Sequence, residues 1–427
     1  MMRKLVVLAV IALAALAPAE VRFGREFGVG TRALSFAGNY TAVANDMSAT
    51  YWNPAAMAFL PVREFQITLD GFRTLASSDV EGNSGSGVRN SSTFDYNERI
   101  RLANLGIMSA IPTIQGGFTM AATYQSPYAF DDSYQYTYNV NRSPSSFSAS
   151  ENYRKYGGLN MWSASFGIQV APGLAAGLTG SLLTGREESN LVQTFSFLDD
   201  PLLDERMDRS YMGYDLRAGI LYNPDNRIKA GLRVALPQRI RFREKVESEA
   251  LDTSDDVIYD EAFEYKGTMK SAPSGAAGIG LTLPWLTISA DVRGTMPFTF
   301  VYPGENIPDT SQAKYFKLGG GVGIEVPMVV LPAMVRFGYS YDQLDLHSFI
   351  YDYDDYDLDE WVWSDDGISV LKDRQTFSAG IGFVTSGTGL ELSYGYQTWA
   401  IEQSNNDRIL KQHFNSHHAM VTFIVRY

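Results

Sequence analysis

The most regular feature of the chain is an alternation of hydrophobic residues with polar or small residues. In residues 333–342, Ala, Val, Phe, Tyr and Tyr alternate with Met, Arg, Gly, Ser and Asp. The same alternation recurs in 228–234, 286–295, 316–326 and 390–400. Successive side chains of a β-strand point to opposite faces. Each segment therefore predicts a strand with one apolar face and one small or polar face.

The connections between these segments alternate in length. The short ones are residues 112–113, 171–173, 223–226, 284–285, 327–332 and 385–387. The long polar ones are residues 76–98, 129–155, 187–209, 241–264, 297–313, 346–372 and 402–412. A soluble β-sandwich also alternates, but short turns at one end and long loops at the other are typical of outer-membrane barrels. We predict an all-β fold, a transmembrane antiparallel β-barrel of about 14 strands, an even number as single-chain bacterial barrels require, over residues 61–427.

The last strand and the inward faces agree with a barrel. Residues 419–427 carry Ala, Val, Phe, Val and Tyr on one face, which is similar to the terminal signal read by the barrel assembly machinery. Charged residues of both signs fall on inward positions: Asp215, Arg217, Lys229, Arg233, Asp291, Arg293, Lys317, Glu325, Arg336 and Glu391. Buried charges need partners, which a plug segment and trapped water would supply. The alternative is that they are the solvated wall of a pore.

The N-terminus predicts export. Arg3 and Lys4 precede an apolar run over residues 5–17, and Ala17-Pro18-Ala19 forms an A-x-A cleavage site. We expect a signal peptide over residues 1–19, cleaved after Ala19; an uncleaved anchor is the alternative. The apolar run is shorter than the roughly 20 residues that a transmembrane helix needs, and no later segment approaches that length.

Composition narrows the class further. The chain has 25 Tyr, 24 Phe and 38 Gly, 19% charged residues and no Cys. The absence of Cys argues against a disulfide-stapled secreted scaffold. The net charge of −13 excludes a general nucleic-acid binder, which needs a basic face.

Residues 20–60 differ from the rest, because they form a Gly/Ala-rich segment that ends in Tyr51-Trp52-Asn53-Pro54-Ala55. Pro54 excludes Asn53 from the α region, so the chain is expected to bend there. The run from Gly30 to Ala58 resembles the hatch of the FadL/TodX family of outer-membrane transporters. That resemblance implies an N-terminal hatch inside the barrel, with Asn53, Pro54 and Ala55 as its gating motif. Family members typically have a Gly-rich run where this chain has residues 35–39.

The candidate ligand-binding residues are the aromatic side chains of this segment. They are Phe23, Phe27, Phe36, Tyr40, Tyr51 and Trp52. An apolar, aromatic-lined pocket inside a polar barrel would hold a hydrophobic ligand away from water. The alternative is plain packing of the hatch against the wall.

The resemblance implies passive uptake of long-chain fatty acids or other hydrophobic compounds across the bacterial outer membrane, gated by the hatch. A PorV-like scaffold or shuttle for type IX protein secretion is the alternative, because those barrels have a similar N-terminal segment. The expected partners are a hydrophobic small molecule, outer-membrane lipid and lipopolysaccharide, and the barrel assembly machinery, with a monomeric barrel. Long loops are expected to be extracellular and both termini periplasmic.

Enzymatic chemistry is not expected. Four histidines are present, and the adjacent His417 and His418 would face opposite sides of a strand. We therefore predict no catalytic residues, metal or cofactor. A side opening to the bilayer would need an interrupted strand, and Gly116-Gly117 and Ser126-Pro127 are the candidate positions because Gly and Pro disturb ladder pairing.

Overall fold

The computed structural model describes most of the chain after the N-terminus. The described residues are 25–26, 28–60, 63–82, 88–114, 116–142, 145–196, 203–236, 238–251, 257–271, 273–295, 298–301, 317–328, 330–344, 348–351, 361–364, 368–385, 387–404 and 408–427. The predicted signal peptide therefore lies outside them. Among the described residues, no helix is long and apolar enough to cross a membrane.

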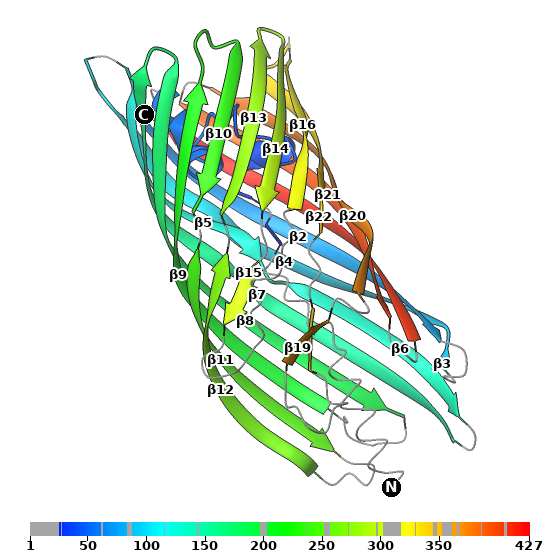
Figure 1. The fold of residues 1–427 in the computed structure, drawn as a ribbon. Coiled ribbons are helices and arrows are strands. Elements are labelled where there is room, and N and C mark those ends of the chain that lie inside the picture. The colour runs from blue at the N-terminus through cyan, green and yellow to red at the C-terminus, as the bar shows by residue number, and fades with distance from the viewer. Residues whose placement is uncertain are drawn as a thin grey trace.

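Over the described residues the strands close into an antiparallel barrel of fourteen strands, as predicted (Figure 1). Pairing of the first long strand with the last closes it. Some barrel strands consist of two pieces; β10 and β11, for example, both pair with β9. The wall comprises β2 (Arg63–Gly82), β3 (Val88–Arg89), β4 (Ser91–Ile111), β5 (Phe118–Ala129), β6 (Asp132–Arg142), β7 (Ser145–Ala171), β8 (Leu174–Phe195), β9 (Leu203–Tyr222), β10 (Ile228–Ala235), β11 (Arg239–Leu251), β12 (Val257–Ser271), β13 (Ser274–Leu283), β14 (Leu286–Thr295), β15 (Phe298–Val301), β16 (Lys317–Pro327), β17 (Ala333–Asp342), β20 (Ile368–Val384), β21 (Thr388–Ser404) and β22 (Arg408–Arg426). A separate hairpin pairs β18 (Ser348–Tyr351) with β19 (Trp361–Ser364).

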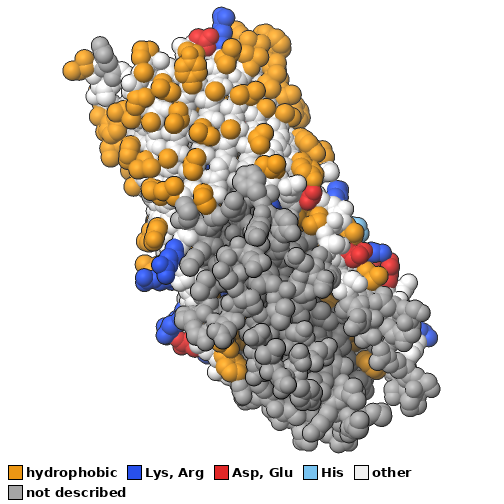
Figure 2. Space-filling view, in the orientation of Figure 1, with side chains coloured by type: hydrophobic (Ala, Val, Ile, Leu, Met, Phe, Trp, Pro, Cys, Tyr) orange, Lys and Arg blue, Asp and Glu red, His pale blue; other side chains and the backbone are white. Residues whose placement is uncertain are grey.

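The alternating pattern places apolar side chains outside and polar ones inside. In β17, Arg336 is fully buried, whereas the next residue, Phe337, is 55% exposed. Figure 2 shows the outward hydrophobic side chains gathered in a band at the end of the barrel that carries the short turns. Such a band is what a lipid-facing barrel surface requires.

Five of the predicted long loops are largely strand where the structure describes them, so that part of the sequence interpretation is wrong; they are residues 76–98, 129–155, 187–209, 241–264 and 402–412. Strands β2, β8, β9 and β11 run well into the segments 76–98, 187–209 and 241–264, and β6 and much of β7 occupy 129–155. The reason is that the far end of the barrel is polar on its outer face as well, with exposed ion pairs such as Arg186 to Asp208. A strand that is polar on both faces lacks the alternation by which strands were recognised.

The segment from residue 28 to residue 60, called the inner segment below, lies inside the barrel behind β14 (Figure 1). It contains the short helices α2 (Thr31–Ser35) and α3 (Ala49–Trp52) and the 3-10 helix η1 (Pro54–Phe59). Nearly all of its residues are buried, although helices this short are not stable alone. Contacts with the barrel wall must therefore maintain its shape.

The wall is interrupted between β4 and β5. Among the described residues, their ladder ends at the pair Asn104 and Gln125. The β5–β7 ladder then skips Ser126 and Pro127 before it resumes at Tyr128. On the side where β4 has left, the short strand β1 (Arg25–Glu26) pairs with residues 128–129. The interruption lies at Ser126-Pro127, one of the two predicted positions; Gly116-Gly117 lies at the turn that precedes β5.

Candidate functional site

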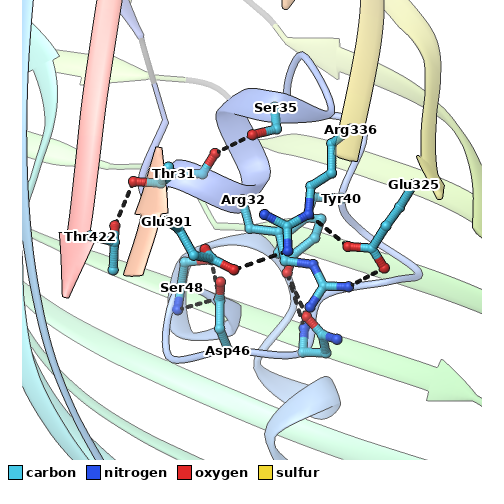
Figure 3. A network of polar contacts seen from close by, with 11 residues as sticks. Thr31, Arg32, Ser35, Tyr40, Asp46, Ser48, Glu325, Arg336, Glu391 and Thr422 are labelled. Atoms are coloured by element: carbon cyan, nitrogen blue, oxygen red, sulfur yellow. Dashed lines mark hydrogen bonds and ion pairs between the residues drawn. The ribbon is translucent and has the colours of Figure 1, made fainter. Parts of the chain in front are cut away.

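The inner segment is joined to one side of the barrel by a chain of buried ion pairs (Figure 3). Arg32 of α2 donates to Glu325 of β16 at 2.7 Å. Arg336 of β17 donates to Glu325 at 2.6 Å and to Glu391 of β21 at 3.0 Å. Burial lowers the pKa of Arg32, but Glu325, Tyr40, Glu391 and Asp46 together more than offset this and raise the pKa above its ordinary value. Arg32 therefore remains charged and tethers α2 to the wall.

Uncharged groups add further links on the same side. Thr31 shares a hydrogen bond with Thr422 of β22, and Ser378 of β20 donates to the Ser35 carbonyl at 2.9 Å. Asn39 donates to the carbonyls of Val322 and Tyr339 at 3.3 and 3.0 Å. The inner segment thus satisfies polar groups of four strands, β16, β17, β20 and β22.

A second set of links involves the predicted gating motif. Asn53 is extended, and its amide donates to the carbonyls of Thr41 and Ile220 at 2.9 and 3.2 Å. Its Oδ1 accepts from the Ala55 amide at 3.2 Å and caps η1, which begins with Pro54. Asn53 therefore fixes the bend inside the inner segment and joins it to β9, while its role in gating stays a prediction.

Several buried charges of the wall have partners in the inner segment, as one of the two sequence interpretations expected. Arg217 and Arg233 each donate to the Tyr51 carbonyl at 3.3 Å. Arg217 also lies over the Tyr51 ring at 3.9 Å, a cation–π contact. Asp291 accepts from the Thr41 amide at 2.8 Å. These three side chains are therefore part of the contact between the inner segment and the wall rather than a solvated pore wall.

The predicted aromatic residues lie in one cluster, except for two that fall outside the described residues, Phe23 and Phe27. Phe36, Tyr40, Tyr51 and Trp52 are all buried. Phe36 and Tyr40 pack at 5.7 Å between ring centroids, and Trp52 donates to the Val29 carbonyl at 2.7 Å. Burial and Asp46 raise the pKa of Tyr40, so its hydroxyl keeps its proton and donates to Asn45 at 2.8 Å.

Glycines on the inward face allow the inner segment to touch the wall backbone. A Cβ on Gly177 would lie 2.3 Å from the Pro54 carbonyl carbon, and one on Gly219 would lie 2.1 Å from Asn53 Oδ1. A Cβ on Gly323 would lie 2.2 Å from the Phe36 ring. The Gly-rich strands are therefore needed for close approach of the inner segment.

The aromatic cluster continues beyond the inner segment. Its members on the wall include Leu159, Met161, Leu183, Tyr128, Phe130, Tyr211, Ile240 and Phe242. These residues lie on β5, β7, β8, β9 and β11 or beside β5 at the wall interruption. The cluster thus connects Trp52 with the interruption and with the far half of the lumen. An apolar region of this kind can bind a hydrophobic molecule by burial of apolar surface.

Sequence reasoning missed the two charged residues of the inner segment. Arg32 and Asp46 are the charged side chains in residues 28–60, and each has a structural role. Asp46 accepts from the Ser48 amide at 2.9 Å and fixes the turn before α3. The sequence signal that could have identified them is the presence of charged residues in a segment otherwise made of apolar and small residues.

Comparison with known proteins gives a consistent family and fold. The sequence matches the family model described as outer membrane protein transport protein (OMPP1/FadL/TodX) over residues 10–296. No curated protein sequence matches it. Three similar solved structures have identities so low that they show the fold alone. The toluene transporter TodX of Pseudomonas putida has a TM-score of 0.60 and 13% identity, over 94% of this chain and 99% of that chain. A FadL homologue of Pseudomonas aeruginosa has a TM-score of 0.57 and 14% identity, over 93% of this chain and 98% of that chain, and the toluene transporter TbuX of Ralstonia pickettii has a TM-score of 0.56 and 12% identity, over 94% of this chain and 99% of that chain.

Proposed function

Because the chain belongs to the OMPP1/FadL/TodX family of outer-membrane transport proteins, we propose that it is a passive channel for long-chain fatty acids or other hydrophobic compounds, gated by the inner segment. Family members are transport channels for hydrophobic compounds and not enzymes. An outer-membrane location in bacteria fits the barrel. The short turns and both termini face the periplasm in this proposal, and the far end faces the medium.

The observation that carries the proposal is the continuous apolar cluster between Trp52 and the far half of the lumen. It offers a hydrophobic compound a path with little exposure to water. The inner segment lies across the route along the lumen toward the short turns, so a ligand can advance in that direction only if the inner segment shifts. Its ties to the wall are hydrogen bonds and ion pairs, which can break and re-form without covalent change.

The wall interruption at Ser126-Pro127 supports a lateral exit. A compound that leaves there would reach the bilayer without crossing the inner segment. The pairing of β1 with residues 128–129 partly closes this position. We propose that the interruption is the side opening and that β1 must leave it during transport.

The test measures uptake and bound ligand together. Cells that lack their own hydrophobic-compound channels would express the protein and take up labelled substrates, and purified protein would be examined by native mass spectrometry with lipid extraction. Trp52→Ala is expected to lower uptake about tenfold or more, equivalent to ~1.4 kcal/mol of lost ligand interaction. Trp285→Ala is the matched control, because Trp285 lies at the short turn between β13 and β14 and is 64% exposed.

Two results would contradict the proposal. Uptake that equals that of cells without the protein would remove the transport function. An empty barrel carrying a stoichiometric exported protein would favour the secretion scaffold instead. The wild-type protein should also purify as a monomer.

A further inference from the structure

The far border of the apolar cluster carries a row of buried charges that the proposed function does not use. The row consists of Lys155 on β7, Glu187 on β8, Arg209 on β9 and Glu244 on β11. All four side chains are at most 13% exposed. Ions at such positions are costly unless they are paired.

The four charges form one closed set of pairs. Lys155 Nζ lies 3.0 Å from Glu187, and Arg209 lies 3.7 Å from the same carboxylate. Arg209 also forms an ion pair with Glu244. Glu187 further accepts from the Tyr211 hydroxyl. Two cations are thus matched by two carboxylates, and the set is neutral.

Each of the four strands changes from apolar to charged along its inward face at this row. Going along the lumen away from the short turns, Leu159 comes before Lys155 on β7, and Leu183 comes before Glu187 on β8. In the same way Tyr211 precedes Arg209 on β9, and Phe242 precedes Glu244 on β11. The charges therefore form the border of the apolar cluster and not a surface network.

The charged row also touches the aromatic part of the cluster. Lys155 lies over the Phe130 ring at 5.9 Å, and Arg209 over the Phe242 ring at 5.3 Å. A ligand in contact with Phe130 and Phe242 would therefore have its polar end beside this row. The charges of the row therefore determine which polar groups a bound ligand can carry at that end.

Nearby charged groups also have partners within the protein. Glu151, buried further out on β7, accepts from the Tyr134 hydroxyl at 3.0 Å and from the Gln193 amide at 2.9 Å. At the wall interruption, Arg99 is paired with Asp131 at 2.9 Å and Arg101 with Asp70 at 3.0 Å. The cations of the charged row and of the wall interruption are thus already matched by carboxylates of the protein.

We propose that this channel selects uncharged hydrophobic compounds, hydrocarbons and alcohols, over fatty-acid anions, and that Glu187 and Glu244 are its specificity-determining residues. A carboxylate that enters must lose its hydration, and the cations that would compensate are occupied by Glu187 and Glu244. An uncharged chain carries no such cost. This inference rests on the proposed function and names the substrate class of the same apolar cluster.

The experiment compares 1-dodecanol with dodecanoate, which share a chain and differ in charge. Each would displace a neutral fluorescent probe from the purified protein in nanodiscs at neutral pH. Wild-type protein is expected to bind dodecanol at least about tenfold more tightly than dodecanoate, a difference of ~1.4 kcal/mol. Glu187→Gln combined with Glu244→Gln should tighten dodecanoate binding about tenfold and leave dodecanol binding within about twofold.

Two further variants separate charge from folding. Lys155→Met with Glu187→Gln removes a cation and a carboxylate together, so it should not gain dodecanoate binding. Glu247→Gln changes an exposed carboxylate of β11 and should behave as wild type. If the double glutamine variant fails to fold, the wild-type comparison and the Lys155→Met/Glu187→Gln variant still test the inference.

The outcomes are distinguishable. Equal affinity of the wild type for dodecanol and dodecanoate would overturn the inference while leaving the transport proposal intact. Failure of both ligands to displace the probe would overturn the transport proposal itself. Unchanged dodecanoate binding in a folded double glutamine variant would remove the role of Glu187 and Glu244.

Discussion

The two sides of the inner segment are attached to the barrel in different ways. Both sides pack closely against the wall: a Cβ on Gly338 would lie 2.3 Å from the Phe36 carbonyl carbon, and one on Gly177 would lie 2.3 Å from the Pro54 carbonyl carbon. Toward β16–β22, buried ion pairs from Arg32 and Arg336 to Glu325 are added to this packing. Toward β7–β10, Asn53 adds a hydrogen bond to the Ile220 carbonyl. We therefore expect the α2 side to be sensitive to the removal of charge and the Asn53 side to be sensitive to added side-chain volume.

The largest effect is expected on the ionic side. Arg336→Met would leave Glu325 and Glu391 as buried carboxylates without this partner, which costs about 3–5 kcal/mol when one member of a buried pair is removed. The midpoint of denaturant unfolding in detergent should fall accordingly. Arg186→Met is the control, because its ion pair with Asp208 is exposed and such pairs contribute about 0–1 kcal/mol. Equal effects of the two variants would contradict the burial argument.

The next effect tests the close packing on the Asn53 side. Gly177→Val would place side-chain atoms in the volume of Pro54, and overpacking of this kind costs up to about 3 kcal/mol. The inner segment should be displaced, and ion conductance in planar bilayers should rise. Gly180→Val on the same strand is the matched control, because its Cβ meets only the Leu216 side chain at 4.0 Å. A conductance rise in the control and not in Gly177→Val would reverse the assignment.

The smallest effect concerns the bend itself. Asn53→Ala leaves the Thr41 and Ile220 carbonyls without this donor, at a cost of about 1–2 kcal/mol. Hydrogen exchange at the Ala55 amide should accelerate, because that amide donates to Asn53 Oδ1. Asn53→Asp keeps the acceptor for Ala55 and loses the two donated bonds, so it should protect the amide better than Asn53→Ala. Identical exchange in the two variants would show that the cap is not what orders η1.

The sequence predicted well where the two faces of a strand meet different surroundings. The alternating segments 286–295 and 333–342 coincide with β14 and β17, and all ten charged positions assigned to the lumen fall on strands of the barrel wall. The far halves of β8 and β9 were missed. There Glu187 faces the lumen and Arg186 faces outward, so charge occupies both faces and period-two hydrophobicity disappears.

The sequence identified only part of the candidate site. The position of Asn53 and the burial of Phe36, Tyr40, Tyr51 and Trp52 follow from a local, apolar, proline-containing pattern. Whether those aromatic residues contact ligand stays a prediction. The charged row of Lys155, Glu187, Arg209 and Glu244 gave no recognisable motif, because its members come from four strands and have no fixed spacing.

By itself, the sequence determined the barrel, its inward and outward faces and the separate character of the N-terminal segment. These depend on local periodicity and composition, which a single strand or segment already contains. Only the tertiary structure decided which cation meets which carboxylate, because Arg32 and Glu325 are brought together by closure of the barrel around the inner segment. The same holds for the wall interruption, where β4 departs and β1 takes its place beside β5. Pairing across the lumen depends on register and closure, and neither is encoded within one strand.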